Sequence, residues 1–540
     1  MSHSRRKFIK NSATLAALAG TGSLGQLGAL GALAQPGSQE PRGSTNGIQI
    51  GADSFADEGT EKVLDILEEK GAVNTLYLST FTYDRGITGR PGPGKNYPGH
   101  GVEASDKNYF HGGNYATPHA QYYTGTAIKG EKLKAPDLGS LDILAEVLPK
   151  AKRRGMKVIC SIQDGFNYPD DLSFVKDFAE IDLQGRKSGA MCFFQPDVRE
   201  FWKSVAVDLC SSYPIDGVLL FNERNGPLLN AIGVSHAQGI DAAKVTCFCP
   251  WHEKAAKAHG IDFQRAKEGY RKLNQYVQNS LNGQRPSDGY YVEFERLLLN
   301  YPEIMAYNQL FDIGKQQILK DVYTSVKAIR AALEVGFHIE HTNSFNPLYR
   351  ASRDYAELAT MADFLKVVVY NNCGGERYVS FINNICQTVF KDVPPGELMK
   401  MNNHLLNYSN EAPIEDLAAA GLSADYVLRE TQRAKAGVAG AGLAAAARVP
   451  GAAGAASASG VAASGVAGTA GVPGKCRILP GIDVNIPTGE KSRKASPEDT
   501  YAATVSALKG GADGIILSRK YSEMRLENLA AAGRAFRESI

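Results

Sequence analysis

The chain has little of what marks a disulfide-rich, a strongly charged or a membrane-embedded protein. Its 8 cysteines are spread over 540 residues, which is too few for a disulfide scaffold. The 59 basic and 57 acidic residues leave a formal net charge of +2, which argues against a nucleic-acid partner. Beyond the N-terminal region no stretch is long and apolar enough to span a membrane. What remains is an ordinary globular composition, with 43% hydrophobic and 21% charged residues.

Two common catalytic motifs are also missing. The first expected strand is followed by Gly51-Ala-Asp-Ser rather than by a G-x-G-x-x-G loop, so nucleotide chemistry is not indicated. No Gly-x-Ser-x-Gly elbow stands beside an apolar strand, which argues against serine hydrolysis. We therefore expect no cofactor.

Residues 4–10 read Ser-Arg-Arg-Lys-Phe-Ile-Lys and resemble a twin-arginine export signal. A weakly apolar stretch follows over residues 13–33, and Ala32-Leu33-Ala34 forms an Ala-x-Ala cleavage site. The resemblance implies a signal peptide at residues 1–34, passage through the twin-arginine translocation machinery, and a periplasmic or secreted mature protein. Residues 35–46 are expected to be a linker.

Eight short apolar runs alternate with segments of helical periodicity over residues 47–540. The expected strands are 48–53, 75–81, 157–163, 217–222, 336–341, 364–370, 476–482 and 514–518. The expected helices include 61–70, 141–154, 198–211, 352–361 and 497–508. Apolar strands that alternate with helices indicate a parallel sheet covered on both faces. Eight such units favour a (β/α)8 TIM barrel of the α/β class over an open, doubly wound sheet.

Three insertions interrupt this order, at residues 85–137, 165–195 and 224–335. Each follows an expected strand, and the loops at the carboxyl ends of barrel strands are where such folds build their sites. Residues 436–475 are nearly all Ala, Gly, Val, Ser and Pro. Since that composition cannot bury a core, we expect a disordered loop there.

Polar side chains collect where the expected strands end. The candidates for substrate binding are Asn222, Asp53, Asp164, His341, Asn343, Tyr370 and Asn371, and the candidate catalytic carboxylates are Glu223, Asp483 and Glu340. Any one of them could merely cap a helix or fix a turn. Together they form a bowl of donors and acceptors, which suits a polyhydroxylated, carbohydrate substrate.

Two segments carry a resemblance to glycoside-hydrolase-like (β/α)8 barrels. They are Phe194-Gln-Pro-Asp-Val-Arg-Glu-Phe201 and Tyr213-Pro-Ile-Asp-Gly-Val-Leu-Leu-Phe-Asn-Glu223. Asn222-Glu223 is similar to the Asn-Glu pair that closes the fourth strand in the large retaining clan of barrel glycosidases. The resemblance implies that Glu223 is the acid/base. It also places Asp483, after the seventh strand, as the nucleophile, although that clan has Glu there.

Two other assignments of Glu223 stay open. In a second barrel glycosidase clan the fourth-strand carboxylate is the nucleophile and a fifth-strand Glu is the acid, which would make Glu340 the partner. Glycoside hydrolysis needs one protonated acid and one carboxylate, and both arrangements supply them. Alternatively, Glu223 forms a structural ion pair with Arg224 or Arg519.

Cys247-Phe-Cys249-Pro-Trp-His252 has metal-ligand spacing, and a similar Cys-rich loop binds zinc in some barrel galactosidases. A tetrahedral site needs a fourth ligand, which a remote residue such as Cys192 or Cys210 would have to supply. The simpler interpretation is a loop with two small buried thiols.

Other functions fit parts of the sequence. A metal-dependent sugar isomerase or epimerase would use Asp164, Glu223 and His341 as ligands, with Asp483 as a further one. A Schiff-base lyase would use Lys520. A non-catalytic carbohydrate-binding barrel would need the bowl alone.

The export signal is tested by changing Arg5 and Arg6 together to Lys. We expect this variant to stay in the cytoplasm with its signal uncleaved, because the arginine pair is the recognised feature. Cell fractionation and N-terminal sequencing measure the result, with Arg42→Lys in the expected linker as the control. Normal export and cleavage of the double variant would contradict the assignment.

Overall fold

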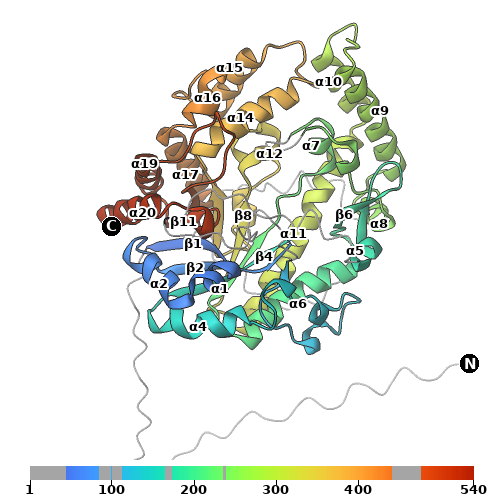
Figure 1. Cartoon of the computed structure of the whole chain (residues 1–540). Helices are drawn as coiled ribbons and strands as arrows, with labels where there is room; N and C mark the ends of the chain where they lie inside the picture. The colour runs from blue at the N-terminus through green and yellow to red at the C-terminus, as the bar shows by residue number, and fades with distance from the viewer. Residues whose placement is uncertain (1–43, 84–98, 100–111, 165–172, 235–238, 441–475) are drawn as a thin grey trace, which may run out of the picture. The chain divides into compact units, whose positions relative to one another are not determined.

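Eight parallel strands close into a barrel around a buried interior (Figure 1). In chain order they are β1 (Thr45–Gly51), β2 (Thr75–Thr82), β4 (Lys157–Gln163), β7 (Gly217–Phe221), β8 (Glu334–Ile339), β9 (Phe364–Val368), β10 (Arg477–Asp483) and β11 (Gly514–Ser518). Each strand pairs with its neighbours in this order, and β1 pairs with both β2 and β11, which closes the ring. The (β/α)8 barrel predicted from the sequence is confirmed.

The computed structural model describes residues 44–83, 99, 112–164, 173–234, 239–440 and 476–540. The expected signal peptide at 1–34 lies outside the described residues, as do residues 85–98 and 100–111 of the first insertion and residues 441–475 of the expected Ala/Gly-rich loop. None of the helices in the described part is long and apolar enough to cross a bilayer.

Helices surround the strands, and their ends follow the sequence signals (Figure 1). The main ones are α2 (Thr60–Glu69), α4 (Ile143–Arg153), α6 (Pro196–Ser212), α11 (Glu303–Ile329), α14 (Asn372–Ile385), α17 (Ala424–Ala439), α19 (Pro497–Lys509) and α20 (Leu526–Ser539). The Asp142 side chain accepts from two backbone N–H groups at the start of α4. Ser496 and Asp499 form a capping box on α19. Such caps satisfy backbone donors that the helix itself leaves free.

The barrel interior has an apolar floor and a polar upper layer. The floor consists of Tyr77, Ile159, Leu219, Phe221, Phe364, Leu479 and Ile516. Gly336 on β8 makes room for this layer, because a Cβ there would lie 2.1 Å from the Phe364 ring. Above it, the Gln49 side chain of β1 accepts hydrogen bonds from Lys366 of β9 and from Ser518 of β11. Polar groups therefore point inward at the carboxyl ends of the strands.

Several boundaries differ from those expected. The linker at 35–46 is too long by two residues, because Thr45 and Asn46 already pair with β11. The helix expected at 352–361 shrinks to one turn, α13 (Tyr355–Leu358), capped by Asp354. Residues 436–439 of the expected loop are helical instead, because α17 continues to Ala439.

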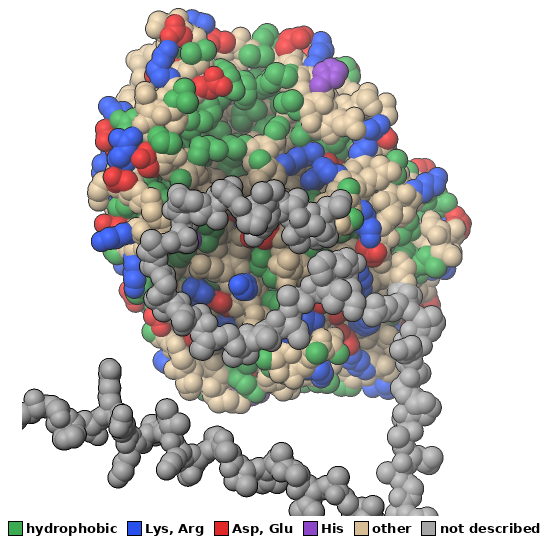
Figure 2. All heavy atoms as spheres, turned by 180° about the vertical axis from the view of Figure 1, so that it is seen from behind, with side chains coloured by type: hydrophobic (Ala, Val, Ile, Leu, Met, Phe, Trp, Pro, Cys, Tyr) green, Lys and Arg blue, Asp and Glu red, His purple; other side chains and the backbone are tan. Residues whose placement is uncertain are grey.

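The second and third insertions contain regular structure, and the helices that the sequence indicates near residues 263–280 and 315–333 of the third are present as α9 (Phe263–Leu281) and α11. The second holds a hairpin of β5 (Ala179–Ile181) and β6 (Lys187–Met191). The third also holds α8 (Pro250–Ala258) and α10 (Tyr290–Asn300). The face opposite to that of Figure 1 is hollowed, and basic and acidic side chains lie inside the hollow (Figure 2).

Candidate active site and cysteine–histidine cluster

Glu223 lies two residues beyond the end of β7, and its side chain is 38% exposed. Its Oε1 lies 2.7 Å from Nε2 of His338, which points inward from β8. The His338 ring is buried and stacks on Phe221 with centroids 4.4 Å apart. Glu223 is thus an accessible carboxylate that a buried imidazole holds in place.

Burial and, to a smaller extent, the nearby charge of Lys366 lower the pKa of His338 to about 4. The hydrogen bond to Glu223 opposes this shift but does not reverse it. At neutral pH the ring is therefore uncharged. Because Nε2 faces a carboxylate, which can only accept, we assign the proton of the neutral ring to Nε2, and Nε2–H donates the hydrogen bond. Glu223 consequently accepts this hydrogen bond at Oε1.

Lys366 is a member of the site that sequence analysis missed. It is fully buried in the middle of β9, and its Nζ donates to Gln49 and, at 3.2 Å, to the Tyr370 hydroxyl. Burial lowers the pKa of Lys366 to about 7, while the charge of Glu223 acts in the opposite direction. The available signal was a lysine inside an otherwise apolar strand, since a buried charge has to be stabilised by partners.

Glu340 follows β8 directly and is 3% exposed. Burial raises its pKa to about 7, and the negative charge of Glu223 raises it too, whereas Lys315 acts in the opposite direction. The Tyr349 hydroxyl donates to Oε1, and the Thr342 hydroxyl lies 3.4 Å from Oε2. Glu340 and Glu223 therefore influence each other electrostatically, and Glu340 retains its proton to a higher pH than an ordinary glutamate.

Asp483 is the last residue of β10 and is completely buried. Its Oδ2 accepts from the Cys373 backbone N–H at 2.9 Å, and its Oδ1 accepts from Ile486 N–H at 3.0 Å. Burial raises the pKa of this carboxyl group, and the two backbone donors oppose the shift. Both oxygens are thus engaged in fixing the first turn of α14 and the loop after β10.

The predicted substrate residues Asn222 and Asp164 bind each other. Asn222 Nδ2 donates to Asp164 at 2.7 Å, and its Oδ1 accepts from the Arg224 backbone N–H. Arg224 pairs with Asp164 at 2.9 Å and with Glu180 at 3.4 Å, so its ion pairs join the ends of β4 and β7 to the β5–β6 hairpin. Arg519, the other arginine considered as an ion-pair partner of Glu223, forms an ion pair with Glu523.

The remaining predicted substrate residues are spread along the strand ends. Tyr370 contacts Lys366, and Glu223 raises its pKa further beyond the effect of burial, so it belongs to the central group. His341 Nε2 is 3.1 Å from the Tyr426 hydroxyl. Asn343 Nδ2 donates to the Tyr355 hydroxyl. Asn371 and Asp53 are also buried, at 4% and 3% exposure.

The ligand set of the alternative isomerase is not assembled. Asp164 is held by Arg224 and Asn222, His341 by Tyr426, and Asp483 by backbone donors. Within the described ranges, the side chains that do converge as metal ligands belong to a different group, the cysteine–histidine cluster described below.

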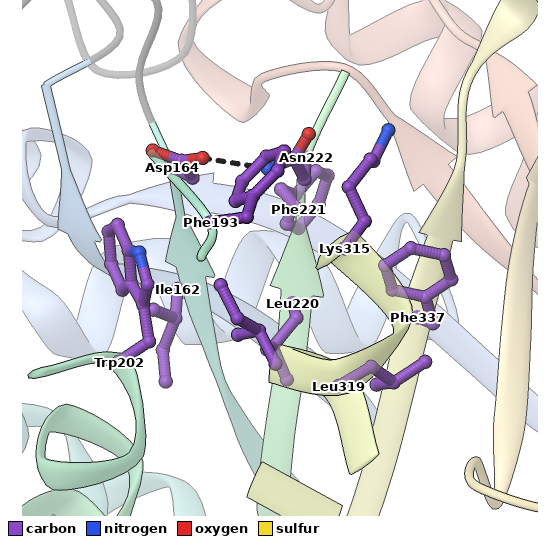
Figure 3. A pocket seen from close by; sticks show the side chains of 11 residues that line it. Ile162, Asp164, Phe193, Trp202, Leu220, Phe221, Asn222, Lys315, Leu319 and Phe337 are labelled. Carbon is purple, nitrogen blue, oxygen red and sulfur yellow. Dashed lines mark hydrogen bonds between the residues drawn. The ribbon is translucent and has the colours of Figure 1, made fainter. Parts of the chain in front are cut away.

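A small cavity lies beside the site but not in it. It measures about 30 Å³ and lies between the barrel wall and helices α6 and α11 (Figure 3). Ile162, Leu220, Phe337, Trp202, Ile318 and Leu319 supply its apolar lining, with Lys315, Asp164 and Asn222 at its polar end. A cavity of this size is too small for a sugar ring.

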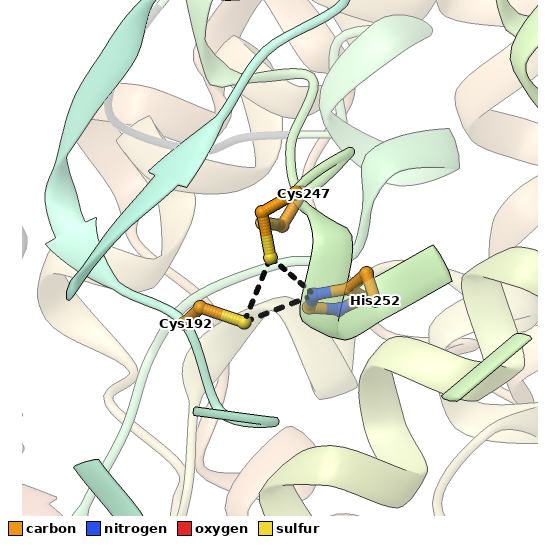
Figure 4. A group of neighbouring side chains, drawn as sticks. Cys192, Cys247 and His252 are labelled. Carbon is orange, nitrogen blue, oxygen red and sulfur yellow. Dashed lines mark hydrogen bonds between the residues drawn. The ribbon is translucent and has the colours of Figure 1, made fainter. Parts of the chain in front are cut away.

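The cysteine–histidine cluster consists of Cys192, Cys247, Cys249 and His252, whose ligand atoms all lie within 4.8 Å of one another. Figure 4 labels three of them, Cys192, Cys247 and His252. Cys192 follows β6 in the second insertion, and the other three lie at the start of α8 in the third. The structure thus supplies the fourth ligand as Cys192, while Cys210 stays in α6 outside the cluster.

The geometry of the cluster fits a tetrahedral zinc site. The Sγ atoms of Cys192 and Cys249 are 3.5 Å apart, and His252 Nδ1 is 3.1 and 3.9 Å from them. Zinc–sulfur bonds of about 2.3 Å place two thiolates about 3.8 Å apart. Burial raises the pKa of the Cys192 and Cys247 thiols, whereas hydrogen bonds from both lower that of Cys249. A cation would stabilise the buried thiolates and join the two insertions.

No family model matches the chain, and neither does any curated protein. Among solved structures, it is 13% identical to an alpha-L-fucosidase isoenzyme 2 from Paenibacillus thiaminolyticus, covering 92% of this chain and 49% of that one with a TM-score of 0.45. It is 12% identical to a beta-galactosidase from the haloarchaeon Halorubrum lacusprofundi, covering 92% of this chain and 58% of that one with a TM-score of 0.47. It is 10% identical to the PgaB glycoside hydrolase domain from Bordetella bronchiseptica, covering 88% of this chain and 94% of that one with a TM-score of 0.42. The chain therefore spans about half the length of the fucosidase.

The cluster generates a prediction about metal content. We expect purified protein to carry about one zinc ion per chain, and Cys192→Ser to lose it and to unfold at a lower temperature, because bound metal stabilises the folded state. Elemental analysis and thermal unfolding measure both effects. Cys210→Ser, which alters a buried thiol outside the cluster, is the matched control. A metal-free wild type whose stability a chelator leaves unchanged would contradict the prediction.

Proposed function

We propose that the protein is an exported glycoside hydrolase that uses Glu223 and Glu340 as its two carboxyl groups. The observation that carries the proposal is the pair itself. An accessible carboxylate and a buried glutamate whose pKa is about 7 lie at adjacent strand ends and feel each other's charge. Two carboxyl groups kept in different protonation states are what glycosidic bond cleavage requires.

Glu340 serves as the general acid. Its pKa of about 7 keeps a large fraction protonated at neutral pH. Its partners Tyr349 and Thr342 are hydroxyl groups, which can donate to the carboxylate or accept from the protonated acid. The site therefore tolerates the gain and loss of a proton at Glu340 during turnover.

Glu223 serves as the nucleophile. Its side chain is the most exposed of the three candidate carboxyl groups, at 38% against 3% for the whole residue of Glu340 and 0% for Asp483. The neutral His338 ring donates to one oxygen and orients the group without protonating it. Such a carboxylate can attack the anomeric carbon while the leaving oxygen takes the proton of Glu340.

Asp483, the nucleophile of the other arrangement, is less suited to that role. Both of its oxygens accept backbone N–H groups, so an attack would break hydrogen bonds that hold α14 and the loop after β10. Unlike hydroxyl groups, those N–H donors cannot turn into acceptors. The assignment to Asp483 stays a prediction that the variants below distinguish.

The proposal also includes the location of the enzyme. Export by the twin-arginine pathway, supported by the sequence of residues 4–34, would put the enzyme in the periplasm or outside the cell.

A non-catalytic carbohydrate-binding barrel is the alternative class of function. It predicts sugar binding without turnover, whereas the buried glutamate with a raised pKa favours an acid that reacts.

Replacement of each carboxyl group separates the two arrangements. Glu340→Gln removes the acid and should lower hydrolysis of natural glycosides about 10²- to 10⁴-fold. Aryl glycosides with good leaving groups should lose less, because they need little protonation. Glu223→Gln should abolish activity on both substrate types, since no covalent intermediate can form. Steady-state kcat/KM on the two substrate types measures these effects.

Asp483→Asn is the comparison variant. We expect it to lower stability and leave the catalytic preference for good leaving groups unchanged. If azide rescues Glu223→Gln with a retained glycosyl azide while Asp483→Asn is inactive on aryl glycosides, Glu223 is the acid/base and the present assignment is wrong. Full activity of Glu223→Gln on every accepted glycoside would remove the proposed function.

The pH dependence of kcat/KM provides an independent test. The acid Glu340 must be protonated, and its pKa is raised to about 7, so activity should be present below that pH and fall as the pH rises through it. The Tyr349 hydroxyl bond lowers this pKa. Tyr349→Phe should therefore move the alkaline limb to higher pH, which a profile on a natural glycoside, whose leaving group needs the proton, measures. A limb that moves to lower pH, or that persists in Glu340→Gln, would contradict the assignment.

A further inference from the structure

Arg377 stands out among the arginines by its lack of an acidic partner. Within the described residues, every other buried or half-buried arginine has a carboxylate oxygen within 4.0 Å. These arginines are Arg154, Arg199, Arg224, Arg350, Arg353, Arg429, Arg433, Arg477, Arg493 and Arg519. Arg377 is half-buried on α14 and forms no such pair there. A guanidinium that is partly removed from water gains from an anion beside it.

Arg377 lies next to the candidate active site. Its Nη1 donates to Nδ1 of His341 at 3.2 Å, and its guanidinium carbon is 5.7 Å from the centre of the Tyr370 ring. Tyr370 in turn contacts Lys366, which is within the electrostatic influence of Glu223. The positive charge of Arg377 also lowers the pKa values of Asp483 and Tyr370. A ligand that reaches Glu223 would thus be within a few side chains of Arg377.

Two buried amides at the start of α14, the helix that carries Arg377, also have unused hydrogen-bonding capacity. Asn371 Oδ1 and Asn372 Nδ2 have no hydrogen-bond partner in the structure, and the two residues are 4% and 3% exposed. Buried polar atoms are normally paired, so an unpaired one calls for an explanation, and a ligand that completes the pairing is one. An acceptor and a donor on the helix that also carries a guanidinium can complement a sugar that has both hydroxyl groups and an anionic group.

We propose that Arg377, with Asn371 and Asn372, forms a subsite for an anionic substituent on the carbohydrate, either the carboxylate of a uronic acid or a sulfate ester. The planar guanidinium matches either anion with two parallel hydrogen bonds. One of its nitrogens is already bound to His341, which orients the fork and leaves its other donors for the ligand. This inference rests on the proposed function only in taking the ligand to be a carbohydrate.

Equilibrium binding tests the subsite without turnover. Calorimetric titration of the wild-type protein would use D-glucuronate and D-galacturonate, their neutral parents D-glucose and D-galactose, and the 6-sulfates of both neutral sugars. We expect at least one anionic sugar to bind more tightly than its neutral parent. Arg377→Gln should remove that preference, weakening the anionic sugar about 10- to 100-fold and changing the neutral one little.

Arg534→Gln is the matched control. Arg534 also lies over a tyrosine ring, 5.1 Å from the centre of Tyr501, but it is exposed on the outer helix α20. We expect this variant to bind like the wild type. Arg377→Lys should restore part of the preference, since it keeps the charge but not the paired donors.

The outcomes separate the two ligand sources and the two proposals. Preference for the uronates identifies a carboxylate, and preference for the 6-sulfates identifies a sulfate ester. Equal binding of anionic and neutral sugars, no binding of any anionic sugar, or an undiminished preference in Arg377→Gln would overturn the subsite. Anion preference in a protein that hydrolyses none of the corresponding aryl glycosides would overturn the glycosidase and leave the subsite standing.

Discussion

The burial of charge at the carboxyl ends of the barrel strands is the constraint on which the site depends. Lys366 and Glu340 are both almost wholly removed from water, and each has its pKa displaced to about 7 by that burial. Desolvation alone would neutralise such groups, so each needs partners. Gln49 and Tyr370 supply them for Lys366, and Tyr349 for Glu340. The charge of Glu223 raises the pKa values of both Lys366 and Glu340, and Glu223 is the group of the three that solvent reaches.

Barrel closure provides the rigid frame for this arrangement, and the insertions support it from outside. Arg224, next to Glu223 in the chain, donates to the Met191 carbonyl at 2.9 Å, directly before the cluster ligand Cys192. The Cys247 carbonyl accepts from Tyr307 of α11, the helix that also carries Lys315. The cluster therefore ties the second and third insertions to the end of β7. A metal ion bound there would hold these insertions in place rather than take part in the chemistry, because none of the cluster ligands is one of the carboxylates Glu223, Glu340 and Asp483.

The sequence was most informative where structure is local. The expected strands 157–163 and 514–518 coincide with β4 and β11, because an apolar run between polar turns leaves little choice of boundary. The strand order then placed Glu223 and Glu340 at one end of a barrel. Groups that depend on distant partners were not foreseen. Lys366 is paired with a residue 317 positions away, and the two backbone donors that hold Asp483 depend on the folded turns around it.

The identity of the carboxylate that attacks the sugar is the most direct test of this account. The wild-type enzyme would be incubated with the 2-deoxy-2-fluoro analogue of an aryl glycoside that it hydrolyses. Such an analogue slows the breakdown of a glycosyl-enzyme intermediate, so the labelled peptide can be located by mass spectrometry. The account predicts the label on Glu223. A label on Asp483, or turnover without any covalent label, would contradict it.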